Sequence, residues 1–299
     1  MKNILKLILS LSGVAIIVGI VVMTSTLATD DDNDKKVELT YVEWSSEVAS
    51  TNVIKVVLEE LGYKVDIIPV SAAVMWQAVA SGDADGLVAA WLHTTHAHYL
   101  TAVKHKVENL GPNLRGTKIG LVVPQYVTID SIEELNANAN NFKRKIIGID
   151  PGAGLMTKTE QVMEKYQLKE FRLIEGSGAT MAAALANAIK NEEWIVVTSW
   201  TPHWMFSRWK LKYLSDSKGI YNPSSANDNN GKEFIGTIVR KGLKEDQPEV
   251  YKILDKFYWE PSDMEQVMIW NEEEEAKPYE NAKRWVQENR DRVKNWLSP

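Results

Sequence analysis

The stretch GDADGLVAAW, from Gly82 to Trp91, has an echo in NEEWIVVTSW, from Asn191 to Trp200. Each begins with polar, turn-forming residues and continues as a hydrophobic run of strand length that ends on tryptophan. The segments around both stretches alternate between strand-like and helix-like patterns in the same series. Such alternation is typical of largely parallel sheets covered by helices. The repeat therefore predicts an α/β chain with two lobes.

The two series of predicted elements can be followed along the printed sequence. Between Ser45 and Gly62, apolar residues recur at helical spacing, and Gly62 closes the predicted helix. The first series comprises strands at 37–44, 64–70, 85–91 and 118–124, with helices at 45–63 and 72–82. The second comprises strands at 144–150, 170–176, 194–200 and 234–241, a helix from Leu155 and another at 179–190.

The lobe boundaries follow from this series. We expect residues 37–122 to form the first lobe and residues 123–240 the second, with crossings near Pro124 and near 231–234. The helical residues from about 241 to 299 are expected to return to the first lobe. The polar stretch NPSSANDNNGK, residues 222–232, predicts a flexible loop.

Residues 1–36 form a membrane signal followed by an acidic tether. Lys2 and Lys6 flank an uncharged run of 17 residues, Leu7 to Met23, and acidic residues follow at 30–32. Positive charge before the run and negative charge after it predict that the following chain is exported. The run is long for the core of a cleaved signal peptide and short for a spanning helix. The sequence is compatible with a cleaved signal peptide and with a retained membrane anchor, and it slightly favours the anchor.

Composition excludes several classes of protein and site. The chain of 299 residues has no cysteine, which excludes disulfides, thiolate metal ligands and a lipid-modified N-terminal cysteine. A net charge of −6 at pH 7 argues against a nucleic-acid partner, which a basic surface would bind. Eleven tryptophans, well above ordinary usage, indicate aromatic surfaces built for contact.

Three of these tryptophans stand at the exits of predicted strands: Trp44, Trp91 and Trp200. Ligands of open α/β sheets bind beyond the carboxyl ends of the strands. If the lobes face each other, these rings line a shared cleft. Aromatic ring faces attract a cation that has no hydrogen to donate, such as a quaternary ammonium. Each tryptophan alone could simply pack a strand end, but the set of three favours a cation cage.

The stretch GIDPGAGL, from Gly148 to Leu155, complements the cage. It reads as a strand, a Pro-Gly turn and the start of a helix, whose free N–H groups and positive dipole end suit an anion. It lacks the patterns of dinucleotide-binding loops and P-loops, so a small carboxylate fits better than a pyrophosphate. A plain strand–turn–helix connection explains the residues about as well. The cation cage and this site for a carboxylate (the carboxylate seat) together imply a zwitterion with a methylated ammonium group, which is a betaine.

A histidine cluster, His93, His96 and His98, offers a different reading as a metal site. Its spacings of three and two do not place the ligands on one helical face, and no H-E-x-x-H motif is present. Surface histidines account for one or two of the three. A hydrolase is not supported, because the sequence has no G-x-S-x-G nucleophile motif. No metal, cofactor or catalytic residue is therefore predicted.

Five motifs taken together resemble one family, the glycine betaine-binding proteins of ABC importers (OpuAC type): YVEWSSEVASTNV, AAWLHTTH, GLVVPQY, GIDPGAGL and TSWTPHWMF. The resemblance runs from about Glu38 to the C-terminus. It implies a two-lobed periplasmic-binding-protein fold, type II-like, with the ligand in the cleft between lobes. It also implies that Trp44, Trp91 and Trp200 grip the trimethylammonium group. The carboxylate is then held by the backbone N–H groups of Gly154 and Leu155 and by the His96 side chain.

The function implied by the resemblance is that of an extracytoplasmic, substrate-binding, non-enzymatic protein for osmoprotectant uptake. It would deliver glycine betaine, or a similar quaternary-ammonium zwitterion, to the permease subunits of an ABC importer. Its N-terminal segment would attach it to the membrane, unless cleavage releases it. The alternatives are a receptor for choline, carnitine or another solute, and, with less support, a metal receptor that uses the histidine cluster.

Overall fold

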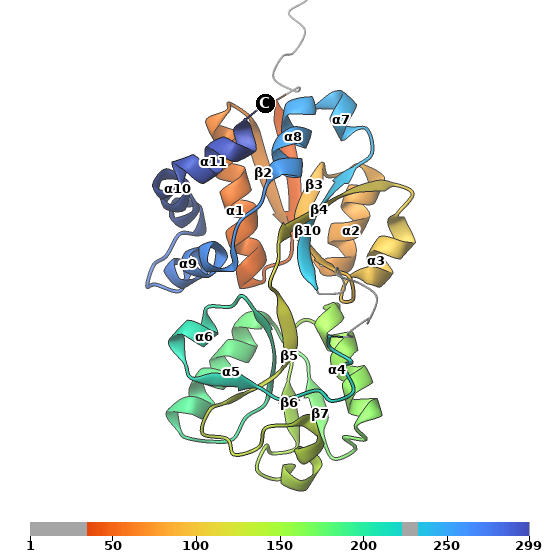
Figure 1. Cartoon of the computed structure of the whole chain (residues 1–299), viewed down its shortest axis with the longest axis vertical. Coiled ribbons are helices and arrows are strands. Elements are labelled where there is room, and N and C mark those ends of the chain that lie inside the picture. Colours follow the sequence, from red (N-terminus) through yellow and green to blue (C-terminus); the bar gives the residue numbers. More distant parts are fainter. Residues whose placement is uncertain (1–34, 223–232, 299) are drawn as a thin grey trace, which may run out of the picture.

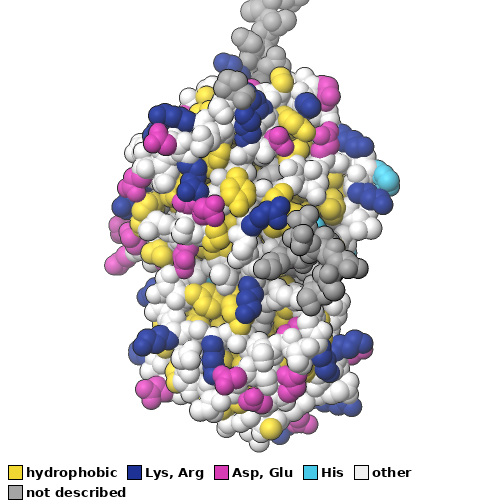
Figure 2. Space-filling view, in the orientation of Figure 1, with side chains coloured by type: hydrophobic (Ala, Val, Ile, Leu, Met, Phe, Trp, Pro, Cys, Tyr) yellow, Lys and Arg dark blue, Asp and Glu magenta, His cyan; other side chains and the backbone are white. Residues whose placement is uncertain are grey.

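The structure of the chain, a computed structural model, describes residues 35–222 and 233–298. These residues form two lobes stacked along the long axis of the molecule, each with one five-stranded sheet and helices on its faces (Figure 1). The predicted two-lobed α/β architecture is confirmed. On the face drawn in Figure 2, acidic and basic side chains are interspersed over both lobes.

The sheet of the first lobe combines parallel and antiparallel pairs. Its order is β2 (Lys64–Pro69), β1 (Lys36–Tyr41), β3 (Gly86–Leu92), β10 (Phe234–Arg240) and β4 (Val107–Leu114). β1 is parallel to β2 and β3, whereas β10 is antiparallel to β3 and β4. All seven residues of β3 are buried, as expected for a central strand covered on both faces.

The sheet of the second lobe repeats this arrangement. Its order is β7 (Arg172–Ile174), β6 (Lys145–Ile147), β8 (Val197–Thr201), β5 (Lys118–Pro124) and β9 (Leu211–Tyr213). β6 is parallel to β7 and β8, and β5 is antiparallel to β8 and β9. β3 and β8, the strands of the two echoing stretches, thus occupy the same central position in their sheets.

Sheet membership differs from two expectations. The sheets are mixed, not largely parallel, because β5 and β10 each join a sheet after a crossing between lobes and run against the preceding strands. The expected boundaries placed most of β5 in the first lobe and β10 in the second, whereas each strand belongs to the other sheet. A strand pattern alone does not state which sheet the strand joins.

Helices cover both faces of each sheet (Figure 1). In the second lobe they are α4 (Gly154–Lys165), α5 (Gly178–Lys190), α6 (Met205–Arg208) and the short 3-10 helices Ile132–Glu134 and Asn136–Asn138. In the first lobe they are α1 (Ser45–Glu60), α2 (Ala72–Ser81), α3 (Ala97–Val103), α7 (Leu243–Asp246), α8 (Pro248–Lys256), α9 (Pro261–Asn271), α10 (Pro278–Glu288) and α11 (Arg290–Leu297).

The C-terminal helices pack on the first lobe and contribute buried side chains to its core. Trp259, Trp285 and Trp296 are almost fully buried, with ring centroids 5.5 Å apart for the first pair and 6.0 Å for the second. Such ring contacts stabilise a core beyond the burial of their area. These tryptophans therefore have a packing role in the core of the first lobe.

Two predicted features lie outside the described residues: the membrane segment within residues 1–34, and residues 223–232 of the polar loop. Within 35–222 and 233–298, none of the helices has the length and apolar character needed to cross a bilayer.

Candidate ligand-binding site

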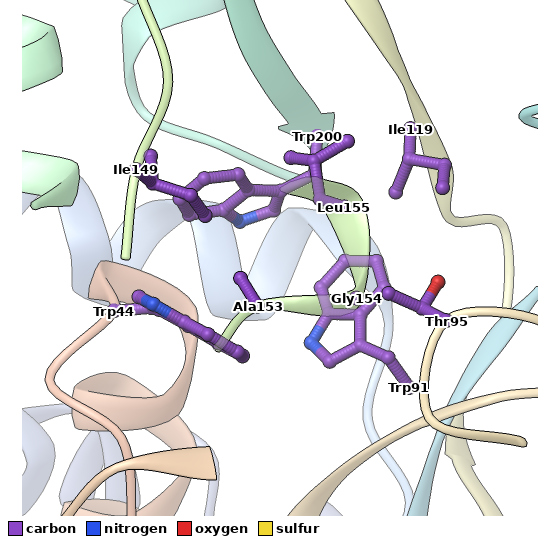
Figure 3. Close-up of a pocket in the computed structure, with 9 residues that line it drawn as sticks. All are labelled: Trp44, Trp91, Thr95, Ile119, Ile149, Ala153, Gly154, Leu155 and Trp200. Carbon is purple, nitrogen blue, oxygen red and sulfur yellow. The ribbon is translucent and has the colours of Figure 1, made fainter. Parts of the chain in front are cut away.

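A cavity lies between the two lobes, and Figure 3 shows the nine residues that line it. It holds about 280 Å³ of space free of atoms, its opening included. Five of the six predicted site residues line it: Trp44, Trp91, Gly154, Leu155 and Trp200. Four further residues line it that no sequence motif singles out: Thr95, Ile119, Ile149 and Ala153.

The three tryptophans reach the cavity from three elements. Trp44 is the N-cap residue of α1, Trp91 lies near the end of β3, and Trp200 lies near the end of β8. All three are at least 94% buried, since their exposed fractions are 6%, 4% and 4%. The Trp44 and Trp200 rings lie 6.4 Å apart, tilted by 55°. Rings from both lobes therefore surround one small space.

Each of the three indole N–H groups has an acceptor in the protein. Trp44 Nε1 donates to Asp150 Oδ2 at 2.9 Å, Trp91 Nε1 to Glu47 Oε1 at 2.7 Å, and Trp200 Nε1 to Ser46 Oγ at 3.1 Å. With these donors satisfied, the rings present apolar, electron-rich surface to the cavity. Such a surface suits a methylated cation better than an amine that must keep its hydrogen bonds.

The N-terminus of α4 forms another wall of the cavity. Gly154 and Leu155 are the first two residues of the helix, so their N–H groups have no acceptor within it. The same end carries the positive pole of the helix dipole, which favours an anion. A Cβ at position 154 would lie 2.1 Å from the Thr95 carbonyl oxygen. Only glycine therefore allows α4 to approach the first lobe this closely.

His96 is fully buried beside the cage but does not line the cavity. Its Nδ1 accepts hydrogen bonds from the Trp91 backbone N–H at 3.2 Å and from Trp76 Nε1 at 3.4 Å. The proton of the neutral ring therefore belongs on Nε2, which has no hydrogen-bond partner within the described chain. Burial, followed by repulsion from His98, lowers the pKa of His96 to about 3. His96 thus keeps a free donor.

The other two histidines of the cluster face different surroundings. The exposed ring of His93 packs edge-on against Phe234 at 4.9 Å, and exposed His98 lies 3.9 Å from Tyr99. Residues 35–222 and 233–298 contain no group of three acidic, histidine or cysteine side chains that could hold a metal ion. The geometry therefore gives the metal reading no support.

The turn that carries His96 is held by Glu233. The carboxylate of Glu233 accepts hydrogen bonds from the backbone N–H groups of Thr94 and Thr95, at 2.8 and 2.9 Å, and from both hydroxyl groups. Glu233 directly precedes β10, which pairs with β3. A residue far away in sequence thus fixes the turn after Trp91.

Direct contacts join the lobes around the cavity. Besides the indole bonds of Trp44 and Trp200, the Tyr99 hydroxyl donates to the Gly152 carbonyl at 2.9 Å. On another side of the cavity, Ser45 Oγ and His203 Nε2 lie 3.3 Å apart. The structure therefore shows the lobes closed over the cavity.

The chain matches a known family over most of its length. Residues 35–288 match the OpuAC family, described as the substrate-binding domain of the ABC-type glycine betaine transport system. Among curated proteins, the glycine betaine/carnitine transport binding protein of Listeria monocytogenes is 43% identical over 153 residues. That match spans 50% of this chain and 48% of the Listeria protein, about half of each.

Two solved structures resemble the whole described chain. One is lactococcal OpuAC in its closed-liganded conformation with glycine betaine, at 45% identity and a TM-score of 0.81, covering 88% of this chain and 100% of that one. The other is the glycine betaine, L-proline ABC transporter binding protein from Borrelia burgdorferi, at 42% identity and a TM-score of 0.83. It covers 88% of this chain and 97% of its own.

Proposed function

This chain belongs to the OpuAC family of substrate-binding domains of ABC-type glycine betaine transport systems, and from that premise we propose that it binds glycine betaine in the cavity between its lobes. The observation that carries the proposal is the convergence of Trp44, Trp91 and Trp200, from both lobes, on one cavity. A trimethylammonium group placed among these rings would gain roughly 1–2 kcal/mol per favourable ring contact, since the site is desolvated.

The carboxylate of the ligand would be received by three donors. The Gly154 and Leu155 N–H groups lack intrahelical acceptors, and His96 Nε2 is an unpartnered buried donor. A buried donor without an acceptor is costly, which a ligand carboxylate would relieve. These donors discriminate betaine from choline, because choline has the ammonium but no carboxylate. Because His96 does not line the cavity as it stands, its ring must approach the ligand as betaine fills the site.

Closure of the lobes would report ligand to the transporter. The donors to the carboxylate come from both lobes, as do the rings of the cage, so only the closed form completes the site. We propose that the closed, loaded protein docks on the permease subunits of an ABC importer. Substrate-binding proteins of such importers work outside the cytoplasm, and attachment through residues 1–36 belongs to the same proposal.

Carnitine and choline are the main alternatives as ligands. Both are quaternary ammonium compounds that the same cage would attract, and they differ in how they would meet the carboxylate seat.

Thermal shift and calorimetry on the full chain in detergent test the proposal. Glycine betaine, proline betaine, carnitine, choline and Zn²⁺ are compared at matched concentrations. At a hundredfold excess over its Kd, a ligand stabilises the folded state by about 2.7 kcal/mol, which raises the melting temperature by a few degrees. We expect this shift with glycine betaine. A shift with Zn²⁺ and none with any quaternary ammonium compound would overturn the proposal.

A further inference from the structure

A carboxylate is buried next to the cage without lining the cavity. Glu47 is the third residue of α1, and its side chain has no exposed surface. One oxygen accepts from Trp91 Nε1 at 2.7 Å, and the other from the Ser46 hydroxyl at 2.5 Å. Within the described residues, no charged group influences the pKa of Glu47. The acid is therefore buried without a cationic partner in that part of the chain.

The hydrogen bonds of Glu47 connect it to two of the three cage rings. The Ser46 hydroxyl that donates to Glu47 also accepts from Trp200 Nε1 at 3.1 Å. Trp91 and Trp200 come from different lobes, so this short chain of bonds reaches both walls of the site. Each link donates toward Glu47, which is the arrangement that favours a carboxylate over a carboxylic acid.

Two opposing effects act on this carboxylate. Burial raises the pKa of Glu47, and the donors from Ser46, Trp91 and the backbone N–H of Glu47 lower it, which leaves the pKa at about 7. An ionised carboxylate inside a protein is costly unless a positive charge neutralises it. The apolar cavity offers no such charge from the protein. A quaternary ammonium bound among the rings would supply it.

We infer that Glu47 is the buried counter-ion of the quaternary ammonium group, and that it makes the cage select a positive charge over an uncharged group of the same shape. Glu47 acts on the ligand through Trp91 and through space, so it is a positioning and specificity-determining residue. The negative charge is weakly screened here because water is excluded. Its hydrogen bond to the Trp91 N–H also increases electron density on the ring face that meets the cation. The inference rests on the proposed function.

A pair of ligands with the same shape separates charge from fit. tert-Butylacetate has the carboxylate and three methyl groups of glycine betaine, with carbon in place of the positive nitrogen. The affinities of the full chain for both compounds are measured by calorimetry, for the wild type and for Glu47→Gln. Glutamine keeps an acceptor for the Trp91 indole and removes the charge. We expect Glu47→Gln to weaken betaine binding about tenfold, the loss of one weakly screened charge pair. Binding of tert-butylacetate should stay unchanged or tighten.

Two further variants serve as a control and as a replacement in this test. Glu43→Gln is the matched control, because Glu43 is an exposed carboxylate four positions before Glu47. We expect it to leave the ratio of the two affinities unchanged. If Glu47→Gln does not fold, Ser46→Ala replaces it: the three cage rings remain, but the carboxylate loses its hydroxyl donor and takes up a proton more readily. The ratio of betaine affinity to tert-butylacetate affinity should then fall, as in Glu47→Gln.

The outcomes are distinguishable. A ratio that falls in Glu47→Gln and not in Glu43→Gln supports the inference. Equal losses for both ligands in Glu47→Gln would reduce Glu47 to a packing residue and overturn it. If the wild type binds neither ligand, the proposed function itself fails, whatever the variants do.

Discussion

Two strand ends in this protein carry the same local pattern and use it differently. At the end of β3, Trp91 is followed by the buried residue His96, and at the end of β8, Trp200 is followed by the buried residue His203. Burial lowers the pKa of each histidine to about 3, so both rings are neutral. The two segments therefore start from the same chemistry.

The difference lies in the second ring nitrogen. His203 accepts from the Met205 N–H through Nδ1, and its Nε2 lies 3.3 Å from Ser45 Oγ in the opposite lobe. Its ring also packs edge-on against Trp200 at 4.6 Å. His96 has no partner for Nε2 among the residues described. His203 thus packs against a cavity-lining ring and links the lobes, whereas His96 keeps an unpartnered donor.

Removing Trp91 or Trp200 should cause the largest loss of betaine affinity. If only one of the two variants lost affinity, the two strand ends would not contribute equally to the site. Trp91→Ala and Trp200→Ala each remove a ring from the cage, and we expect each to weaken betaine binding by about thirtyfold or more, equivalent to ~2 kcal/mol. Calorimetry measures the effect. The matched control is Trp194→Ala, which removes a half-buried ring that packs on Phe142 outside the cavity. An unchanged betaine affinity in either variant would contradict the assignment of that tryptophan to the cation cage.

Replacing His96 or His203 with asparagine tests whether the two histidines have different roles. His96→Asn removes the donor proposed for the ligand carboxylate, so betaine affinity should fall about tenfold or more. His203→Asn removes a long contact between lobes and the edge-on packing against Trp200, but no donor to the ligand, so we expect about threefold or less. Both are measured by titration with glycine betaine, with folding checked by circular dichroism. A larger loss in His203→Asn would reverse the two roles.

Both buried histidines should make the protein less stable in acid. Their folded pKa of about 3 lies below the ordinary value of 6.5, so between these values the unfolded chain binds more protons. Stability is therefore fully present above about pH 6.5 and is lost as the pH falls toward 3, by up to about 1.4 kcal/mol per pH unit for each histidine.

Denaturant melts between about pH 7 and pH 4 measure this slope. His203→Asn should reduce this slope, and His105→Asn, at an exposed position, is the matched control. An identical slope in all three proteins would show that His203 titrates normally in the folded state.

A modest effect of pH on betaine affinity is expected from Glu47, the acid that accepts the hydrogen bond of the Trp91 indole. Burial raises the pKa of Glu47 to about 7, so its carboxylate is mostly neutral below this pH and mostly charged above it. If the charged form favours the ligand cation, betaine affinity should rise about three- to fivefold from about pH 6 to pH 8. Glu47→Gln should bind equally at both pH values. A pH dependence that survives in this variant has another source.

The sequence predicted those parts of the fold that depend on local pattern. The repeated pattern around Trp91 and Trp200 led to the two-lobed architecture because β3 and β8 are buried central strands that each end near a tryptophan. β4 was missed, since Gly111 and Pro112 interrupt its strand pattern and its pairing with β10 is irregular. The lobe membership of β5 and β10 depends on pairing between distant segments, which no local pattern records.

The site was predictable to a different extent for each residue. The three tryptophans follow from their positions at strand ends, whereas His96 was selected only by family resemblance, because spacing did not separate it from its neighbours. Glu47 was overlooked, although it lies seven residues before Ile54 on the apolar stripe of α1. A charged residue on a buried helical face was the available signal.

The central claim is that the cavity recognises positive charge through its rings, and one titration tests it most directly. Glycine betaine and tert-butylacetate are titrated into the wild-type full chain under identical conditions. The two ligands have the same shape and the same carboxylate, so shape and the anion seat contribute equally. The account predicts that glycine betaine binds at least about a hundredfold more tightly, because three rings each favour the cation by about 1 kcal/mol or more. Equal affinities would show that the rings merely enclose the ligand and would contradict the cation cage.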